Sequence, residues 1–160
     1  MSSDLKNLSS INLLPDASGL RIGIVVSAWN IEITEALFLG AKGTLLNAGV
    51  KDSDIIRKDV PGSFELPLGA KFLLSAIKPD AVICIGCVIQ GETRHFDFIC
   101  QAVSSGIMQL GLENNTPVIF GVLTTGTLQQ AIDRSGGKHG NKGVEAAAVA
   151  IQMALIKKSL

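Results

Sequence analysis

The sequence predicts an α/β protein whose parallel four-stranded sheet carries helices on both faces. Short apolar segments of strand length are separated by longer segments in which apolar residues recur at helical spacing. This alternation persists along the 160-residue chain, which favours right-handed β-α-β crossovers. Polar residues suited to chemistry follow the apolar strands, and sheets of this class bind ligands at the carboxyl ends of their strands. We therefore expect a site at that edge.

The first elements are an N-terminal arm and one strand-helix unit. Residues 1–20 are polar and contain Pro15 and Gly19, which predicts an arm ordered by a neighbouring subunit, with a short strand at 11–14. The segment 21–27, RIGIVVS, is the first strand. The helix after it ends with Gly49 as its C-cap. Its apolar stripe comprises Ile33, Leu37, Gly40, Ala41, Thr44, Leu45 and Ala48.

The second and third units follow the same plan. A strand at 54–60 leads through a Pro-Gly turn into a helix with Pro67 in its first turn. A strand at 81–86 precedes a helix that begins near Thr93 or Arg94. The residues expected to face the sheet are Leu66, Gly69, Ala70, Leu73, Leu74 and Ile77 in the first helix, and Ile99, Ala102, Val103, Gly106, Ile107 and Leu110 in the second.

The last part of the chain adds a strand, a short helix and a long helix. The strand at 117–123 has Phe120 at its middle, and Thr127 with Gln130 predicts a capping box for a helix that ends at Asp133-Arg134. The glycine-rich segment 135–143 is expected to be a mobile loop. The final helix starts after Asn141 and ends with two lysines, and its stripe comprises Val144, Ala148, Ile151 and Leu155.

Composition narrows the class of protein. Charged residues make up 18% and hydrophobic residues 47% of the chain, and the mean hydropathy is +0.39, which favours a homo-oligomer that buries part of its surface. The formal net charge is zero with both signs interspersed, which argues against nucleic acid or a membrane as a partner. No apolar run is long enough to span a bilayer and no export signal is visible, so we expect one soluble, cytoplasmic domain over residues 21–160.

The cysteines do not suggest a disulfide framework. Cys84 and Cys87 form a C-x-x-C, but both lie on or next to a predicted strand, where their side chains point to opposite faces. A redox pair is expected at a helix N-terminus instead. Zinc bound by these two cysteines with His95 and Cys100 would follow no familiar spacing, and we do not favour it.

Aromatic and acidic side chains follow the first two strands. Trp29 comes after the first strand, and Ser63, Phe64 and Glu65 come after the second. An aromatic ring beside a carboxylate can hold a planar heterocycle that is rich in N–H groups, by stacking and by accepting hydrogen bonds. The alternatives are that Trp29 packs under a loop and that Glu65 only complements a helix dipole.

His95 and a cationic segment complete the candidates. A histidine in the first turn of a helix tends to stay neutral and can shuttle a proton, although His95 could equally be a hydrogen-bonded core residue. The glycine spacing lets Arg134, Lys138 and Lys142 converge on one anion such as a phosphate, unless they form an ordinary solvated cluster. The segment lacks the P-loop pattern, so a nucleotide cradle is not expected.

Four motifs, in this order and separation, resemble the lumazine synthase family: DVPGSFELP, GCVIQGETRHFDFIC, PVIFGVLTT and AIDRSGGKHGNKG. The resemblance covers about 21–153. It implies a flavodoxin-like three-layer sandwich and the penultimate step of riboflavin biosynthesis. In that step, 5-amino-6-ribitylaminouracil and 3,4-dihydroxy-2-butanone 4-phosphate condense to 6,7-dimethyl-8-ribityllumazine, phosphate and water, without a cofactor or metal.

The resemblance also implies pentamers with the active site between subunits, assembly of pentamers into icosahedral shells in many members, and riboflavin synthase as a partner. The segment from Arg134 to Lys142 has no insertion relative to shell-forming members, which favours the shell. By resemblance, His95 is the proton donor and acceptor. The matching substrate contacts are Trp29, Ser63, Phe64, Glu65, Cys87, Val88, Ile89, Glu92, Thr93, Phe120, Arg134 and Lys142.

The same resemblance distributes roles. Trp29 stacks on the pyrimidine, Ser63 to Glu65 contact backbone and ribityl groups, and Cys87 to Ile89 form a strand edge that binds the uracil. Phe120 comes from the neighbouring subunit, and Arg134 binds phosphate with the help of Glu92-Thr93 at a helix N-terminus. Trp29, Gln90 and Glu92 stand where Phe, Arg and a small residue are usual. A Glu92 carboxylate would repel phosphate, so only its backbone N–H is expected to contact it.

Two other functions fit parts of the pattern. A Schiff-base aldolase could use Lys142 or Lys138, but it needs a lysine of depressed pKa in an apolar pocket, and a polar glycine-rich loop is a poor place for one. A non-catalytic shell that carries flavin or lumazine would bind ligand without forming product. The synthase is the function that we favour.

Overall fold

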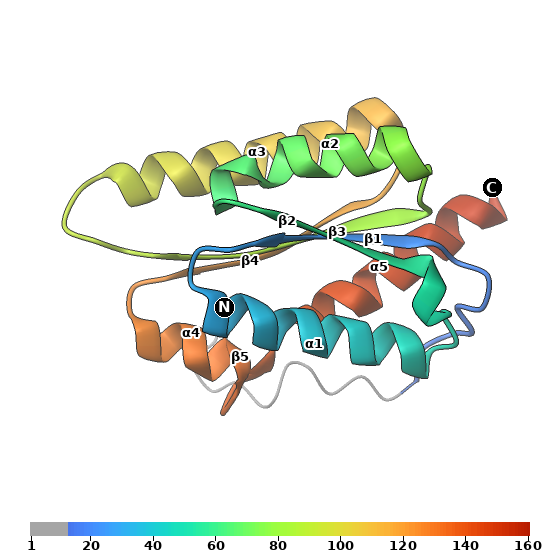
Figure 1. Cartoon of the computed structure of the whole chain (residues 1–160), viewed down its shortest axis with the longest axis horizontal. Helices are drawn as coiled ribbons and strands as arrows, with labels where there is room; N and C mark the ends of the chain where they lie inside the picture. The colour runs from blue at the N-terminus through green and yellow to red at the C-terminus, as the bar shows by residue number, and fades with distance from the viewer. Residues whose placement is uncertain (1–12) are drawn as a thin grey trace.

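A parallel sheet in the order β2-β1-β3-β4 forms the middle layer of the computed structural model, which describes residues 13–160 (Figure 1). The strands are β1 (Ile22–Ser27), β2 (Ile55–Val60), β3 (Ala81–Ile89) and β4 (Val118–Thr125). β1 pairs in parallel with both β2 and β3, and β3 pairs with β4. The predicted four-stranded parallel sheet is therefore confirmed, and the carboxyl ends of its strands share one edge.

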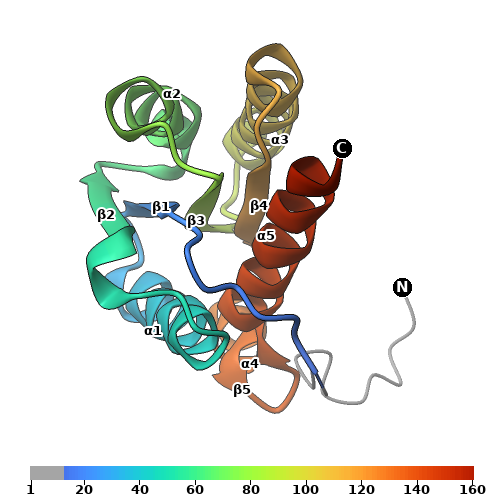
Figure 2. The ribbon, with the colours of Figure 1, turned by 90° about the vertical axis from the view of Figure 1, so that its right-hand side faces the viewer.

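Helices cover both faces of the sheet, as Figure 2 shows end-on. On one side lie α1 (Ile31–Asn47), α4 (Leu128–Arg134) and α5 (Lys142–Ser159), and on the other lie α2 (Leu66–Ile77) and α3 (His95–Asn114). Short connecting elements are the 3-10 helices η1 (Asp52–Asp54) and η2 (Ser63–Glu65) and the strands β5 (Ser135–Gly137) and β6 (Gly140–Asn141). This three-layer arrangement is the flavodoxin-like α/β sandwich that we expected.

The sheet divides the interior into two apolar cores. Because successive strand residues point to opposite faces, β3 contributes Ile83 and Ile85 to the core under α1 and α5, and Val82 to the core under α2 and α3. Cys87 belongs to the first core and Cys84 to the second, which confirms that their side chains point to opposite faces. Every residue of β3 from Ala81 to Cys87 is buried, as expected for a central parallel strand.

α5 packs on α1 mainly through small residues, and two of the four residues of its predicted stripe, Ala148 and Ile151, are buried as expected. Its buried residues are Gly143, Ala146, Ala147, Ala148, Ala150, Ile151 and Ala154. A Cβ atom on Gly143 would overlap the carbonyl oxygen of Leu37 in α1. The predicted members Val144 and Leu155 are only half-buried, because the close approach of the two helices places the alanines in the contact and the larger residues beside it.

Several element boundaries differ from the prediction. β3 continues three residues past Gly86, because its last residues still pair with β4. The segment expected as a loop forms an antiparallel pair of short strands, β5 and β6. α3 starts at His95, and Ala48 rather than Gly49 is the C-cap of α1. Gly49 is the next residue, with φ 99°, a left-handed conformation that glycine adopts without steric cost.

The start of the described chain lies against the core. Ala17 and Leu20 are buried with α1 and α5, and the Ala17 N–H donates to the Ala48 carbonyl at 2.8 Å. Residues 11 and 12 of the strand predicted at 11–14 lie outside the described residues, and residues 13 and 14 have no regular secondary structure. Within residues 13–160, no helix combines the length and the apolar character that crossing a membrane requires.

Candidate active site

A hollow of about 380 Å³ lies at the carboxyl edge of the sheet, where β1, β2 and β3 end. Four separate segments form it, and each follows or ends a strand or begins a helix. It is lined by Trp29, Asn30, Gly62, Ser63, Phe64, Glu65, Cys87, Val88, Ile89, His95 and Ile99. The two aromatic rings, the acid and the imidazole that the sequence singled out thus share one cavity.

The turn after β1 presents Trp29 to this hollow. Asn30 adopts a left-handed conformation, with φ 59°, and its side-chain amide donates to the Cys87 carbonyl at 2.9 Å. Asparagine tolerates this conformation better than most residues. The hydrogen bond ties the end of β1 to the end of β3, and Trp29 is left 72% exposed. The alternative that Trp29 packs beneath a loop is therefore wrong.

The turn after β2 supplies a hydroxyl, a ring and a carboxylate. η2 places Ser63 inward and leaves Phe64 59% exposed, while Pro67 starts α2 immediately afterwards. The Ser63 Oγ atom is buried without a hydrogen-bond partner in the described structure. A Cβ atom on Gly86 would approach this Oγ to 2.6 Å, so glycine in β3 makes room for the turn. An unsatisfied buried hydroxyl is costly, and a ligand can relieve that cost.

His95 is the first residue of α3 and is exposed rather than buried. It stands four residues before Ile99 and eight before the buried Val103, so it continues the inward stripe of α3 beyond the end of the core. Its backbone N–H donates to the Thr93 hydroxyl at 3.4 Å. The alternative of a core histidine is therefore wrong, and the ring is accessible to a bound molecule.

The cysteines next to the hollow are poor nucleophiles and poor joint metal ligands. Burial raises the pKa of the Cys84 thiol to about 12 and that of the Cys87 thiol to about 11. Because the two thiols face opposite cores, one ion cannot bind both. Among residues 13–160, no three His, Cys, Asp or Glu side chains are grouped as metal ligands. What the hollow offers is stacking, hydrogen bonding and proton transfer.

The cationic segment lies apart from the hollow, around the start of α5. Arg134 donates to the His139 carbonyl at 2.6 Å and pairs with Glu145 at 3.0 Å. Lys142 pairs with the other Glu145 oxygen at 3.4 Å. Lys138 instead pairs with Asp133 at 3.5 Å. The expectation that all three cations converge on one anion is therefore wrong for Lys138 in this chain.

Five of the expected site residues lie outside the hollow of their own chain: Glu92, Thr93, Phe120, Arg134 and Lys142. The first two are exposed and belong to the segment between β3 and His95. Phe120 is half-buried on β4 and packs against the core under α2 and α3. Conversely, sequence reasoning missed Asn30, Gly62 and Ile99 as lining residues. The left-handed preference of asparagine just after a strand was the available signal for Asn30.

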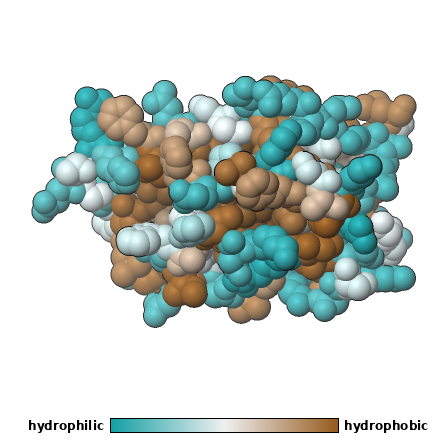
Figure 3. All heavy atoms as spheres, turned by 45° about the horizontal axis from the view of Figure 1, so that its top comes forward, coloured by the Kyte–Doolittle hydropathy of each residue, from teal (hydrophilic) through white to brown (hydrophobic). Residues whose placement is uncertain are grey.

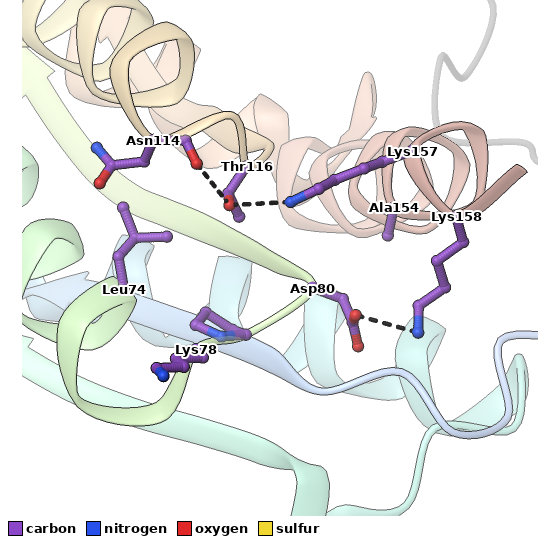
Figure 4. Close-up of a pocket in the computed structure, with 9 residues that line it drawn as sticks. Leu74, Lys78, Asp80, Asn114, Thr116, Ala154, Lys157 and Lys158 are labelled. Carbon is purple, nitrogen blue, oxygen red and sulfur yellow. Dashed lines mark hydrogen bonds and ion pairs between the residues drawn. The ribbon is translucent and has the colours of Figure 1, made fainter. Parts of the chain in front are cut away.

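A second hollow of about 380 Å³ lies at the opposite, amino-terminal end of the strands (Figure 4). Lys78, Lys157 and Lys158 line it, with Lys157 donating to Thr116 at 3.3 Å and Lys158 pairing with Asp80 at 3.2 Å. α2, α3 and α5 all end here, and lysine is the favoured charge at helix C-termini. The helix ends account for these lysines, and none of the expected site residues is present.

The sandwich fold and the hollow at the carboxyl ends of its strands define an α/β enzyme of the flavodoxin-like class that acts on small molecules. Comparison with known proteins is more specific. The family model described as 6,7-dimethyl-8-ribityllumazine synthase matches residues 19–158, so the chain belongs to that family. Similar proteins of the same name occur in Cytophaga hutchinsonii, Flavobacterium johnsoniae and Porphyromonas gingivalis.

These three relatives match nearly the whole of this chain. The Cytophaga protein is 60% identical over 96% of this chain and 97% of its own. The Flavobacterium protein is 55% identical over 99% of this chain and 84% of its own. The Porphyromonas protein is 51% identical over 99% of both chains. The chain is accordingly a transferase that condenses 5-amino-6-ribitylaminouracil with 3,4-dihydroxy-2-butanone 4-phosphate in riboflavin biosynthesis.

Proposed function

We propose that the hollow at the carboxyl edge binds the ribitylaminouracil substrate. The observation that carries this proposal is the presence of Trp29, Phe64, Glu65 and His95 around one cavity. Trp29 stacks on the pyrimidine ring, and the backbone from Cys87 to Ile89 at the end of β3 hydrogen-bonds the uracil edge. Ser63, with its unpartnered hydroxyl, and the neighbouring Phe64 and Glu65 contact the ribityl chain.

The phosphate of the second substrate binds to cations of the adjoining subunit. Arg134 and Lys142 do not line the hollow of their own chain, so a complete site takes the hollow from one chain and the guanidinium from another. Phe120 is supplied by the adjoining chain as well. The backbone N–H groups of Glu92 and Thr93 assist on the side of the hollow, just before α3.

His95 moves protons while the substrates supply both nucleophile and electrophile. The substrate amine attacks the ketone and loses water to form an imine, phosphate is eliminated, and a second condensation with loss of water closes the ring. No cofactor or metal takes part in these steps. Holding both substrates in register supplies much of the rate, since orientation can be worth about 7 to 11 kcal/mol. A Schiff base on Lys142 would break its ion pair with Glu145, which disfavours that mechanism.

Exposed apolar side chains support assembly of the chain into a homo-oligomer. Figure 3, which brings the side of α2 and α3 forward, shows apolar patches between the polar ones. Large apolar residues more than half exposed on α2, α3 and α4 are Leu68, Phe72, Phe98, Met108, Leu112 and Leu128. Burying them between copies would stabilise the assembly. We propose pentamers joined into an icosahedral shell in the cytoplasm, with riboflavin synthase as a partner, built from a domain over 21–160 and an N-terminal arm.

Mixing two defective variants tests the shared site. Trp29→Ala damages the hollow and Arg134→Ala damages the phosphate site, so each homogeneous assembly loses kcat/KM. Equal amounts of the two variants are unfolded and reassembled together. At each interface the hollow is intact with a probability of about one half and Arg134 is intact with the same probability, so about one quarter of the interfaces combine both. We expect kcat/KM to recover to about a quarter of the native value.

The matched control carries both substitutions in one chain and is mixed with an equal amount of native protein. In this mixture, half of the hollows and half of the Arg134 guanidinium groups are intact, so one quarter of the interfaces is again expected to work. Activity of the mixed single variants that stays at their average would show that each site lies within one chain and would overturn this proposal.

A further inference from the structure

We propose that Glu145 is a positioning residue that holds Arg134 and Lys142 ready for the substrate phosphate. This inference rests on the proposed function, in which Arg134 of one subunit binds the phosphate of the sugar substrate. Glu145 is not among the site residues that we expected from the sequence. Its two carboxylate oxygens contact two different cations, Arg134 and Lys142.

The contacts show how one carboxylate fixes both cations. Its Oε1 atom accepts from Arg134 Nη2 at 3.0 Å, and its Oε2 atom lies 3.4 Å from Lys142 Nζ. The side chains of Glu145 and Arg134 are only 18% and 20% exposed. Partial burial strengthens these charge-assisted bonds relative to a pair in open water. Without the carboxylate, the two cations would repel each other and turn towards solvent.

The remaining donors of Arg134 stay available for an anion. Its Nη1 atom donates to the His139 carbonyl at 2.6 Å, while Nη2 serves Glu145. A guanidinium has about five N–H donors, so these two bonds leave three, enough for bidentate contact with a phosphate. Glu145 and the His139 carbonyl together fix the plane of the guanidinium, which sets the direction in which the free N–H groups point.

The start of α5 is capped by Asn141 and not by Glu145. The Asn141 side chain accepts from the Gly143 and Val144 N–H groups at 2.8 and 3.3 Å and so caps the helix. Glu145 lies in the first turn, where a carboxylate adds only a modest dipole contribution. A substitution at position 145 therefore removes the bridge between the two cations and leaves the helix cap in place.

Steady-state kinetics of Glu145→Ala test this role. We expect KM for 3,4-dihydroxy-2-butanone 4-phosphate to rise about tenfold, and kcat and KM for the aminouracil to stay within about twofold. Glu145→Gln keeps an acceptor oxygen for Arg134 and should raise the same KM about threefold. In an Arg134→Ala background, Glu145→Ala should raise this KM by much less than tenfold, because only the positioning of Lys142 is then left to lose.

Glu35→Ala is the matched control, since Glu35 on α1 pairs with Arg57 on β2 and does not line the hollow. It should leave both KM values unchanged. If Arg134→Ala itself leaves KM for the sugar phosphate unchanged, the phosphate site fails and this inference fails with it. If Arg134→Ala raises that KM but neither Glu145 variant does, or if their effects multiply in the double variant, only the positioning role is overturned. Should Glu145→Ala not assemble, Glu145→Gln with and without Arg134→Ala decides the question.

Discussion

His95 stands at the mouth of the hollow, and its contribution to the rate can be bounded. The amine and ketone that react are already a reactive pair, so a proton shuttle assists rather than enables the condensation. General acid-base catalysis is typically worth about 10²- to 10⁴-fold, and we expect His95→Ala to lower kcat by about 10² or less. Single-turnover measurements of phosphate release check this. A fall of more than about 10⁴-fold would contradict it.

The thiols of β3 should be unreactive in the folded protein. With a pKa of about 12, only about one Cys84 thiol in ten thousand is a thiolate at pH 8. Burial also raises the pKa of Cys100, with a further contribution from Asp97, but this residue is only half-buried. We expect iodoacetamide to modify Cys100 before Cys84 and Cys87, as followed by peptide mass spectrometry. Equal rates for all three before denaturation would contradict the burial of β3.

At the scale of single residues, the sequence predicts chemistry better than exposure. Trp29, Phe64, Glu65 and His95 could be grouped because each follows a strand of one parallel sheet. Whether His95 is buried depends on where α3 begins relative to the core, and periodicity alone does not determine that. Arg134 ends α4 and Glu145 lies in the first turn of α5, and the hairpin of β5 and β6 separates them in the sequence. No local sequence pattern therefore indicated that they pair.

The contact between α1 and α5 tolerates no added side chain at Gly143. A Cβ atom there would lie 2.7 Å from the Leu37 carbonyl carbon and would overlap its oxygen. The two helix backbones must separate to accept alanine, so we expect Gly143→Ala to lower the free energy of unfolding by at least about 3 kcal/mol. Urea denaturation at a fixed protein concentration measures this loss.

Gly43, also in a helix, is the control for that substitution. A Cβ atom on Gly43 would meet nothing within 4 Å. Alanine is favoured over glycine inside a helix, so Gly43→Ala should be neutral or stabilise by about 0.5 to 1 kcal/mol. If both variants lose stability equally, the cause is not the close approach of α1 and α5.

At the scale of elements, sequence patterns predicted the order of strands and helices but not their ends or faces. β3 runs to Ile89 because β4 pairs with it to the end, and such pairing is a property of the sheet. The predicted capping box is half correct: Thr127 accepts from the Gln130 N–H, but the Gln130 side chain accepts from Gly126. The buried face of α5 consists mainly of alanines, because the backbones of α1 and α5 approach closely there. A prediction from apolar periodicity favours larger residues for the buried face.

The mass of the whole assembly distinguishes the proposed states. Five chains of 16.8 kDa give about 84 kDa, and sixty give about 1,000 kDa. Because α2, α3 and α4 expose large apolar residues, we expect the particle of about 1,000 kDa in sedimentation-velocity measurements at neutral pH. A sharp species near 84 kDa would limit the assembly to the pentamer, and a lone chain would also rule out the shared site.

The two edges of the sheet suit different uses. α5 runs from Arg134's side of the molecule back to Asp80, so Leu160, which is fully exposed, lies at the edge remote from Trp29 and His95. A biotin or a surface linker joined to Leu160 would therefore attach to each chain at a point remote from the side chains that line its own hollow.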